Sequence, residues 1–234
     1  MKKVVKFGGS SLANAEQFQK VGDIIRSDES RRYVVPSAPG KRFDEDIKVT
    51  DMLYGCYDAA SKGEDFSDKL KAIKERYYEI IKGLGLTLSL EDEFKKIEED
   101  FRAQAGIQYA ASRGEFLNGK IMAAYLGYDF VDAASVIRFD KNGNLEAEET
   151  NKLLSKKLSK CQSAVIPGFY GACADGTVKT FSRGGSDVTG SLVAKAIHAD
   201  IYENWTDVSG FLVADPRIIK NPEAIEAITY KELR

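Results

Sequence analysis

Residues 6–11 read "KFGGSS" and join a short apolar run, residues 2–7, to a segment with helical spacing, residues 12–27. The apolar run predicts a buried strand, and the spacing of the apolar side chains after it predicts an amphipathic helix. Ser10 or Ser11 is expected to cap this helix. Because a helix start carries unpaired N–H groups and glycines let an anion approach closely, the stretch indicates an anion-binding turn.

A second stretch, "RGGSD" at residues 183–187, follows the same plan of strand, cation, glycine pair, hydroxyl and helix. One glycine pair alone is an ordinary turn. Two of them, each with a cation before it and a hydroxyl after it, favour anion binding. Neither stretch has the spacing of G-x-G-x-x-G or G-x-x-x-x-G-K-[ST], so the sequence excludes both of these phosphate-binding motifs.

Strand and helix patterns alternate along the chain, which predicts an α/β fold with a mainly parallel sheet covered on both faces. The helical patterns at residues 51–126 interrupt this alternation and are expected to form a lobe at one edge of the sheet. The polar residues 41–50 predict a mobile loop. "SRGE" at residues 112–115 has the spacing of a capping box, which predicts a helix start there.

Composition excludes several classes of function. The 234 residues carry a net charge of −2 with 30% charged side chains and no basic block, which argues against nucleic-acid binding. No apolar run approaches the roughly 18 residues that span a membrane. A single histidine, His198, excludes a multi-histidine metal site. The three cysteines, Cys56, Cys161 and Cys173, are an odd number without a close pair, which predicts reduced thiols in the cytoplasm.

Five motifs together resemble the aspartate kinases of the amino acid kinase superfamily. They are "KFGGSS" at 6–11, "SRGE" at 112–115, "PGFYG" at 167–171, "FSRGGSD" at 181–187 and "WTDVSGFLVADPR" at 205–217. The resemblance implies a three-layer α/β/α sandwich around a mainly parallel sheet. It also implies transfer of the γ-phosphoryl of ATP to the side-chain carboxylate of aspartate, the first step towards lysine, threonine and methionine.

The resemblance also assigns roles to individual residues. It gives a catalytic role to Lys6 and Asp187. It implies that the amino acid is bound by Thr50, Glu115, Arg183, Gly184, Gly185 and Ser186. It implies that ATP is bound by Lys6, Gly8, Gly9, Ser10, Thr206, Asp207, Leu212 and Arg217. Mg²⁺ is expected to arrive with ATP, with no metal held by protein side chains alone.

The resemblance further implies one catalytic domain, residues 1–234, with its N-terminal part for aspartate and its C-terminal part for ATP. The chain stops at "NPEAIEAITYKELR", which has the pattern of a helix start. We therefore expect it to be part of a longer, homo-oligomeric protein, whose C-terminal ACT regulatory domains are absent from this chain.

Other interpretations stay open at this point. The chain could be another kinase of the same superfamily, acting on glutamate, acetylglutamate or carbamate, or a nucleotide-binding module without turnover. Glu115 could serve only as the acid of a capping box, and Lys6 could be a solvated lysine at the end of a strand. Leu212 stands where some relatives carry a tyrosine, so contacts to the base are expected to differ.

Overall fold

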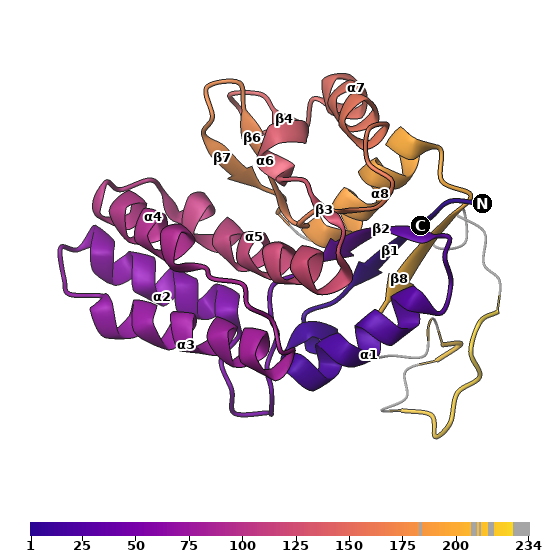
Figure 1. The fold of residues 1–234 in the computed structure, drawn as a ribbon, viewed down its shortest axis with the longest axis horizontal. Helices are drawn as coiled ribbons and strands as arrows, with labels where there is room; N and C mark the ends of the chain where they lie inside the picture. Colours follow the sequence, from indigo (N-terminus) through magenta and orange to yellow (C-terminus); the bar gives the residue numbers. More distant parts are fainter. Residues whose placement is uncertain (183, 207–209, 211, 215–217, 227–234) are drawn as a thin grey trace.

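A parallel sheet lies at the centre of the computed structural model, which describes residues 1–182, 184–206, 210, 212–214 and 218–226. Its five strands lie in the order β3-β5-β2-β1-β8, and every neighbouring pair is parallel. The strands are β1 (Lys3–Phe7), β2 (Arg31–Pro36), β3 (Asp129–Phe130), β5 (Ala164–Val165) and β8 (Ile201–Trp205). Figure 1 shows β1 between β2 and β8, so the first glycine loop follows an interior strand of the sheet.

Helices cover both faces of this sheet, and each face has its own core. Val5 and Phe7 of β1 pack into one core, and Val4 packs into the other, as the alternation of a strand requires. The first core holds the helices α1 (Ala15–Arg26), α2 (Val49–Ser61), α3 (Ser67–Gly83), α4 (Glu91–Arg102) and α5 (Ile107–Leu126). The second holds α6 (Ala133–Val136), α7 (Ala147–Leu158) and α8 (Gly185–Ile197). The predicted α/β fold is thereby confirmed.

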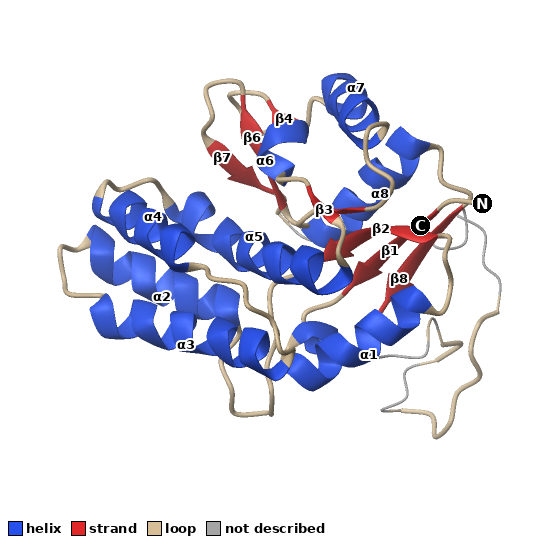
Figure 2. Ribbon diagram, viewed as in Figure 1, coloured by secondary structure: helices blue, strands red, loops and turns tan. Residues whose placement is uncertain are grey.

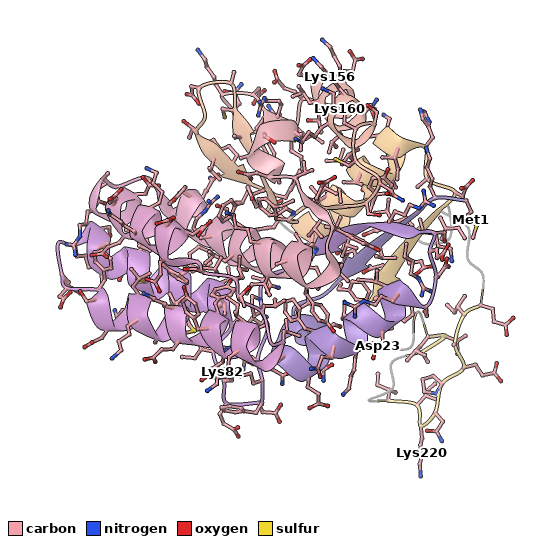
Figure 3. All side chains as sticks on the ribbon, in the orientation of Figure 1. Met1, Asp23, Lys82, Lys156, Lys160 and Lys220 are labelled. Carbon is pink, nitrogen blue, oxygen red and sulfur yellow. The ribbon has the colours of Figure 1, made fainter. Side chains whose placement is uncertain are left out.

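The helices α2 to α5 form the lobe predicted for residues 51–126 and project beyond the sheet (Figure 2). Their contact faces carry Leu70, Ile73 and Phe94, all buried, at helical spacing. Charged side chains lie on the outer surfaces, where Lys82 of α3 and Lys156 of α7 point away from the body of the molecule (Figure 3). The hydrophobic pattern therefore determines which helix faces pack together.

A second, smaller sheet contains β4 (Arg138–Phe139), β6 (Tyr170–Cys173) and β7 (Val178–Thr180). β4 is parallel to β6, and β7 is antiparallel to it. The sequence pattern predicts one strand for residues 163–171. The structure instead divides this segment between β5 of the large sheet and β6 of the small one. The Asn142-Gly143 pair is a sequence signal for a hairpin turn. It forms a tight turn in the structure, which returns the chain to a bridge between Phe139 and Leu145.

Two predicted helix starts are wrong. The helix predicted from residue 12 begins at Ala15, because Asn14 caps it by accepting a hydrogen bond from the backbone N–H of Gln17. Residues 112–115 lie inside α5 and do not start it, since α5 begins five residues earlier, at Ile107. Ser112 donates its hydroxyl hydrogen to the carbonyl of Tyr109, as a serine inside a helix does.

The described part of the chain contains no helix that is both long enough and apolar enough to cross a membrane.

Two glycine-to-alanine substitutions are expected to change stability in opposite directions. Gly55 lies in α2, and a methyl group added there would meet nothing within 4 Å, so Gly55→Ala should stabilise the fold by about 0.5–1 kcal/mol. A methyl group at Gly171 of β6 would lie 2.6 Å from the carbonyl oxygen of Ile137. Gly171→Ala should therefore destabilise by about 1–3 kcal/mol. Urea unfolding of both variants measures the difference; equal effects would contradict this difference in packing.

Candidate active site

The loops that follow β1, β2 and β8 meet at the carboxyl ends of these strands, as expected for neighbouring parallel strands. They border a cavity of about 490 Å³. Its lining residues are Gly8, Gly9 and Ser10 after β1, Ser37, Ala38, Pro39, Gly40, Lys41 and Lys48 after β2, Thr50 of α2, Glu115 of α5 and Thr206 after β8. Six residues predicted as binding residues are thus brought to one cavity from four parts of the chain.

The first glycine loop is held by backbone contacts to its neighbours. The N–H of Gly8 donates to the carbonyl of Trp205 at 3.2 Å, and the carbonyl of Gly9 accepts from the N–H of Gly40 at 2.8 Å. A side chain at Gly40 would lie 2.6 Å from the backbone carbon of Gly9, so this crossing requires glycine. The loop continues into a short 3-10 turn, Ser10–Leu12, and not into an α-helix. The predicted α-helix start directly after this loop is therefore wrong.

Lys6 and Asp187 form an ion pair, with 2.9 Å between Nζ and Oδ1. The lysine side chain is only 11% exposed and the aspartate side chain is 45% exposed. Asp187 lies in the first turn of α8, where the helix macrodipole stabilises a carboxylate. Lys6 is therefore not a solvated lysine at the end of a strand: its ammonium group is buried and oriented by a carboxylate.

The second glycine loop does start a helix. Gly184 is the N-cap of α8, and Gly185 and Ser186 are its first residues. The hydroxyl of Ser37 donates to the hydroxyl of Ser186 at 2.9 Å, which joins this helix start to the loop after β2. Ser186 is buried, and its hydrogen-bond partner Ser37 lines the cavity.

Glu115 is the most unusual group in the site. Its side chain lines the cavity but the residue is only 6% exposed, and its Oε2 is buried without a hydrogen-bond partner. Burial raises the pKa of Glu115 to about 8, although hydrogen bonds from backbone groups, that of Ala38 first, oppose the shift. Since α5 starts at Ile107, Glu115 is not a capping acid. A buried acceptor without a donor matches a ligand that supplies one.

Some predicted residues lie elsewhere. Leu212 pairs with Ala224 in an isolated antiparallel bridge and is not among the residues that line the cavity. Arg183, Asp207 and Arg217 lie outside the described residues, so their predicted roles stay predictions.

The sequence reasoning missed Ser37, Asn118 and Lys48. Ser37 and Lys48 line the cavity, and the fully buried Asn118 donates its amide hydrogen to the carbonyl of Ser37 at 2.6 Å. Ser37 could have been found from its place directly after the second predicted strand. When that strand is parallel to β1, its carboxyl end lies at the same edge of the sheet as the first glycine loop. Nothing local distinguishes Asn118 or Lys48 from other polar residues.

Within the described ranges, no group of three or more histidine, cysteine, aspartate and glutamate side chains is placed to hold a metal ion. The assignment of Mg²⁺ to the phosphates of ATP stays a prediction.

The family model described as "Amino acid kinase family" matches residues 1–234. The fold and the paired loops agree with this match, and the chain belongs to the amino acid kinase family. Among curated relatives, it is similar to Aspartokinase 3 of Bacillus subtilis, with 38% identity over 99% of the chain and 54% of the relative. Lysine-sensitive aspartokinase 3 of Escherichia coli is 28% identical over 98% of the chain and 54% of the relative.

The chain is also similar to solved structures of aspartate kinases. The crystal structure of Clostridium acetobutylicum aspartate kinase superposes with a TM-score of 0.96 and 52% identity, over 100% of this chain and 54% of that one. E. coli aspartokinase III in complex with aspartate and ADP superposes with a TM-score of 0.81 and 26% identity, over 96% of this chain and 53% of that one. The chain thus spans about half the length of these relatives.

Glu115→Gln is expected to stabilise the protein at alkaline pH. The folded pKa of Glu115 is raised from 4.5 to about 8, so its contribution to stability is full below about pH 4.5 and is lost as the pH rises through about 8. Glutamine stays neutral, so the variant should gain about 2–4 kcal/mol near pH 8.5 and little near pH 5. Denaturant unfolding at both pH values measures the difference in the free energy of unfolding between the variant and the unmodified chain. An equal difference at both pH values would contradict a raised pKa for Glu115.

Proposed function

We propose that this chain is the catalytic part of an aspartate kinase. It transfers the γ-phosphoryl of ATP to the side-chain carboxylate of L-aspartate and yields 4-phospho-L-aspartate and ADP. The observation that carries the proposal is Glu115, whose buried Oε2 lacks a donor and lines the cavity. The 38% identity to a Bacillus aspartokinase and the relative solved with aspartate and ADP support the same substrates.

The amino acid is held by its charged ends. The α-ammonium group of aspartate donates hydrogen bonds to Glu115 and stabilises its ionised form. A free α-ammonium is absent from acetylglutamate and carbamate, so this contact favours an unblocked amino acid over those two acceptors. Thr50 and Ser186 supply hydroxyls, and we assign the α-carboxylate to Arg183 by resemblance. The second helix start, at Gly184 and Gly185, adds backbone N–H groups and a favourable dipole.

Phosphoryl transfer needs no general base in this proposal. The acceptor carboxylate has a reference pKa of about 3.9 and is already ionised near neutral pH. One carboxylate oxygen forms a bond to the γ-phosphorus as the bond to the bridging oxygen of ADP breaks, and ADP leaves with that electron pair. The protein must lower the repulsion between two anions, and Lys6, fixed by Asp187, provides the positive charge where they meet.

The phosphates of ATP occupy the first glycine loop, with Gly8, Gly9 and Ser10 closest, and Thr206 lines the same cavity. Mg²⁺ bound to ATP would reduce the charge of the phosphates. We assign residues 1–234 to a single catalytic domain. We further propose that the whole protein is cytoplasmic, in keeping with three cysteines that are all free in the structure. By resemblance to the family, we also propose that it is a homo-oligomer.

The proposal is tested by following ADP release and the acyl phosphate with each acceptor in turn. Aspartate is expected to support release, and glutamate, acetylglutamate and carbamate are expected not to. Release with acetylglutamate but none with aspartate would replace this function by that of another kinase of the family. ATP binding without any transfer at saturating aspartate would indicate a nucleotide-binding module.

Lys6→Ala is expected to lower turnover by about 100- to 1,000-fold, because the charge that stabilises the transferring phosphoryl is removed. The dissociation constant of aspartate should change by less than about threefold, since Glu115 and the second loop remain. Steady-state kinetics and calorimetric titration measure the two quantities. Lys20→Ala is the control, as Lys20 is 59% exposed and pairs with Glu16 on the surface of α1. Unchanged turnover in Lys6→Ala would contradict the role of Lys6.

A further inference from the structure

The segment of residues 41–48 forms a charged loop between the turn after β2 and the start of α2. Both of its ends border the cavity: Gly40 and Lys41 line it at one end, and Lys48 lines it at the other. The sequence predicts a mobile loop here. In the structure, the buried ion pair between Asp46 and Arg76 joins the loop to helix α3 of the lobe, and Arg42 pairs with Asp46 within the loop. Helix α2 begins directly after the loop, at Val49.

One buried arginine of α3 joins the two ends of this loop. Arg76 is 3% exposed and does not line the cavity. Its Nη2 donates to the carbonyl of Gly40 at 2.5 Å, and its Nη1 donates to the carbonyl of Ile47 at 3.2 Å. The same Nη1 lies 2.8 Å from Oδ2 of Asp46. The planar guanidinium group therefore closes the loop from one end to the other, which a lysine ammonium could not do with the same geometry.

Asp46 supplies the counter-charge. Its side chain is 8% exposed and also accepts hydrogen bonds from Nε and Nη2 of Arg42, at 2.9 and 3.1 Å. Arg42 first, and Arg76 in addition, hold the pKa of Asp46 well below its usual range, against the effect of burial. The carboxylate therefore stays charged at neutral pH. A buried arginine without it would be strongly unfavourable, so the two residues act as one unit.

The loop also supports the first glycine loop. The N–H of Gly40 donates to the carbonyl of Gly9, while the carbonyl of Gly40 accepts from Arg76. Arg76 is thus linked through Gly40 to the first glycine loop, which the hydrogen bond from Gly8 to Trp205 also holds, so we expect Arg76 to have little effect on phosphate binding. At the other end of the loop, Arg76 holds the carbonyl of Ile47, the residue before Lys48. The side chain of Lys48 adds a cation to the rim of the cavity.

We propose that Arg76 is a positioning residue. Together with Asp46 it fixes residues 41–48, so that Lys48 stands at the rim of the cavity and binds a carboxylate of a dicarboxylic amino acid. The inference rests on the proposed function for the identity of the ligand. A loop held in its bound conformation lowers the ordering cost of binding, which is why Arg76 acts on affinity although it does not touch the cavity.

Arg76→Lys and Arg76→Ala test the proposal, with Glu79→Gln as the matched control. Glu79 lies on α3 three residues after Arg76 and contacts the same loop through Arg42, but its side chain is 65% exposed. Arg76→Lys should weaken aspartate binding about tenfold or more and change ADP binding by less than about threefold. Glu79→Gln should change neither. Calorimetric titration measures both ligands, and thermal unfolding verifies that each variant is folded.

Two further readouts separate positioning from general destabilisation. Guanidinium ion at millimolar concentration should restore part of the aspartate affinity of Arg76→Ala and leave that of Glu79→Gln unchanged. The double variant Arg76→Lys with Lys48→Met should bind aspartate within about twofold of Lys48→Met alone, because Arg76 acts through Lys48. A folded Arg76 variant with unchanged aspartate affinity would overturn the proposal, and so would fully additive losses in the double variant.

Hydrogen exchange of residues 41–48 distinguishes this inference from the proposed function. If the unmodified chain binds no aspartate, the proposed function fails, but exchange still reports on the loop. Exchange in this segment should be faster in Arg76→Ala than in Glu79→Gln; equal rates would overturn the positioning role whatever the ligand is. Should Arg76→Ala fail to fold, Asp46→Asn removes the counter-charge from the same unit and is expected to give the same changes.

Discussion

The parallel pairing of β1 with both β2 and β8 is the constraint on which the rest of the structure depends. Parallel neighbours end at the same edge, so the loops after three strands must share one small space. Those loops supply the close crossing of Gly9 and Gly40 and bring Thr206 to the same cavity. Lys6 is the last residue but one of the central strand of this trio. Its place in the sheet therefore puts one cation directly before the first glycine loop, where it pairs with Asp187 of α8.

Electrostatic repulsion explains why the site is built from cations and helix starts. Two unit charges of like sign 4 Å apart repel by about 4 kcal/mol at an effective dielectric constant of 20. A carboxylate that approaches a nucleotide meets more than one such charge. The described cavity offers Lys41 and Lys48 at its rim, and the Nζ of Lys6 lies beside Gly8 of the first loop, 3.9 Å from where a Cβ of Gly8 would stand. The large apolar lobe, with Tyr77 and Phe101 fully buried, offsets the cost of burying the charge of Lys6.

The fold class and the helical lobe could be predicted from the sequence, because the spacing of apolar residues acts locally. The glycine loops and the family resemblance together predict six of the twelve residues that line the cavity. Predictions failed where distant packing decides. The spacing of Ser112 and Glu115 also occurs inside a helix, and only the burial of Glu115 beside the loop after β2 reveals its environment. Asn14 competes with Ser10 and Ser11 as the cap of α1, and sequence alone ranks them equally. The charged segment containing Asp46 predicts a mobile loop, because nothing local marks Arg76, 30 residues further along the chain, as the partner of Asp46.

The raised pKa of Glu115 has a consequence for the heat of binding. With a pKa of about 8, this carboxyl is mostly protonated near neutral pH when the cavity holds no cation. A ligand ammonium that pairs with it favours the ionised form, so the proton must leave as the ligand enters. Association is then a proton-exchange reaction with the solvent. The measured enthalpy includes the ionisation heat of whichever buffer accepts that proton, and titrations in phosphate and in Tris would differ although the contacts in the site are identical.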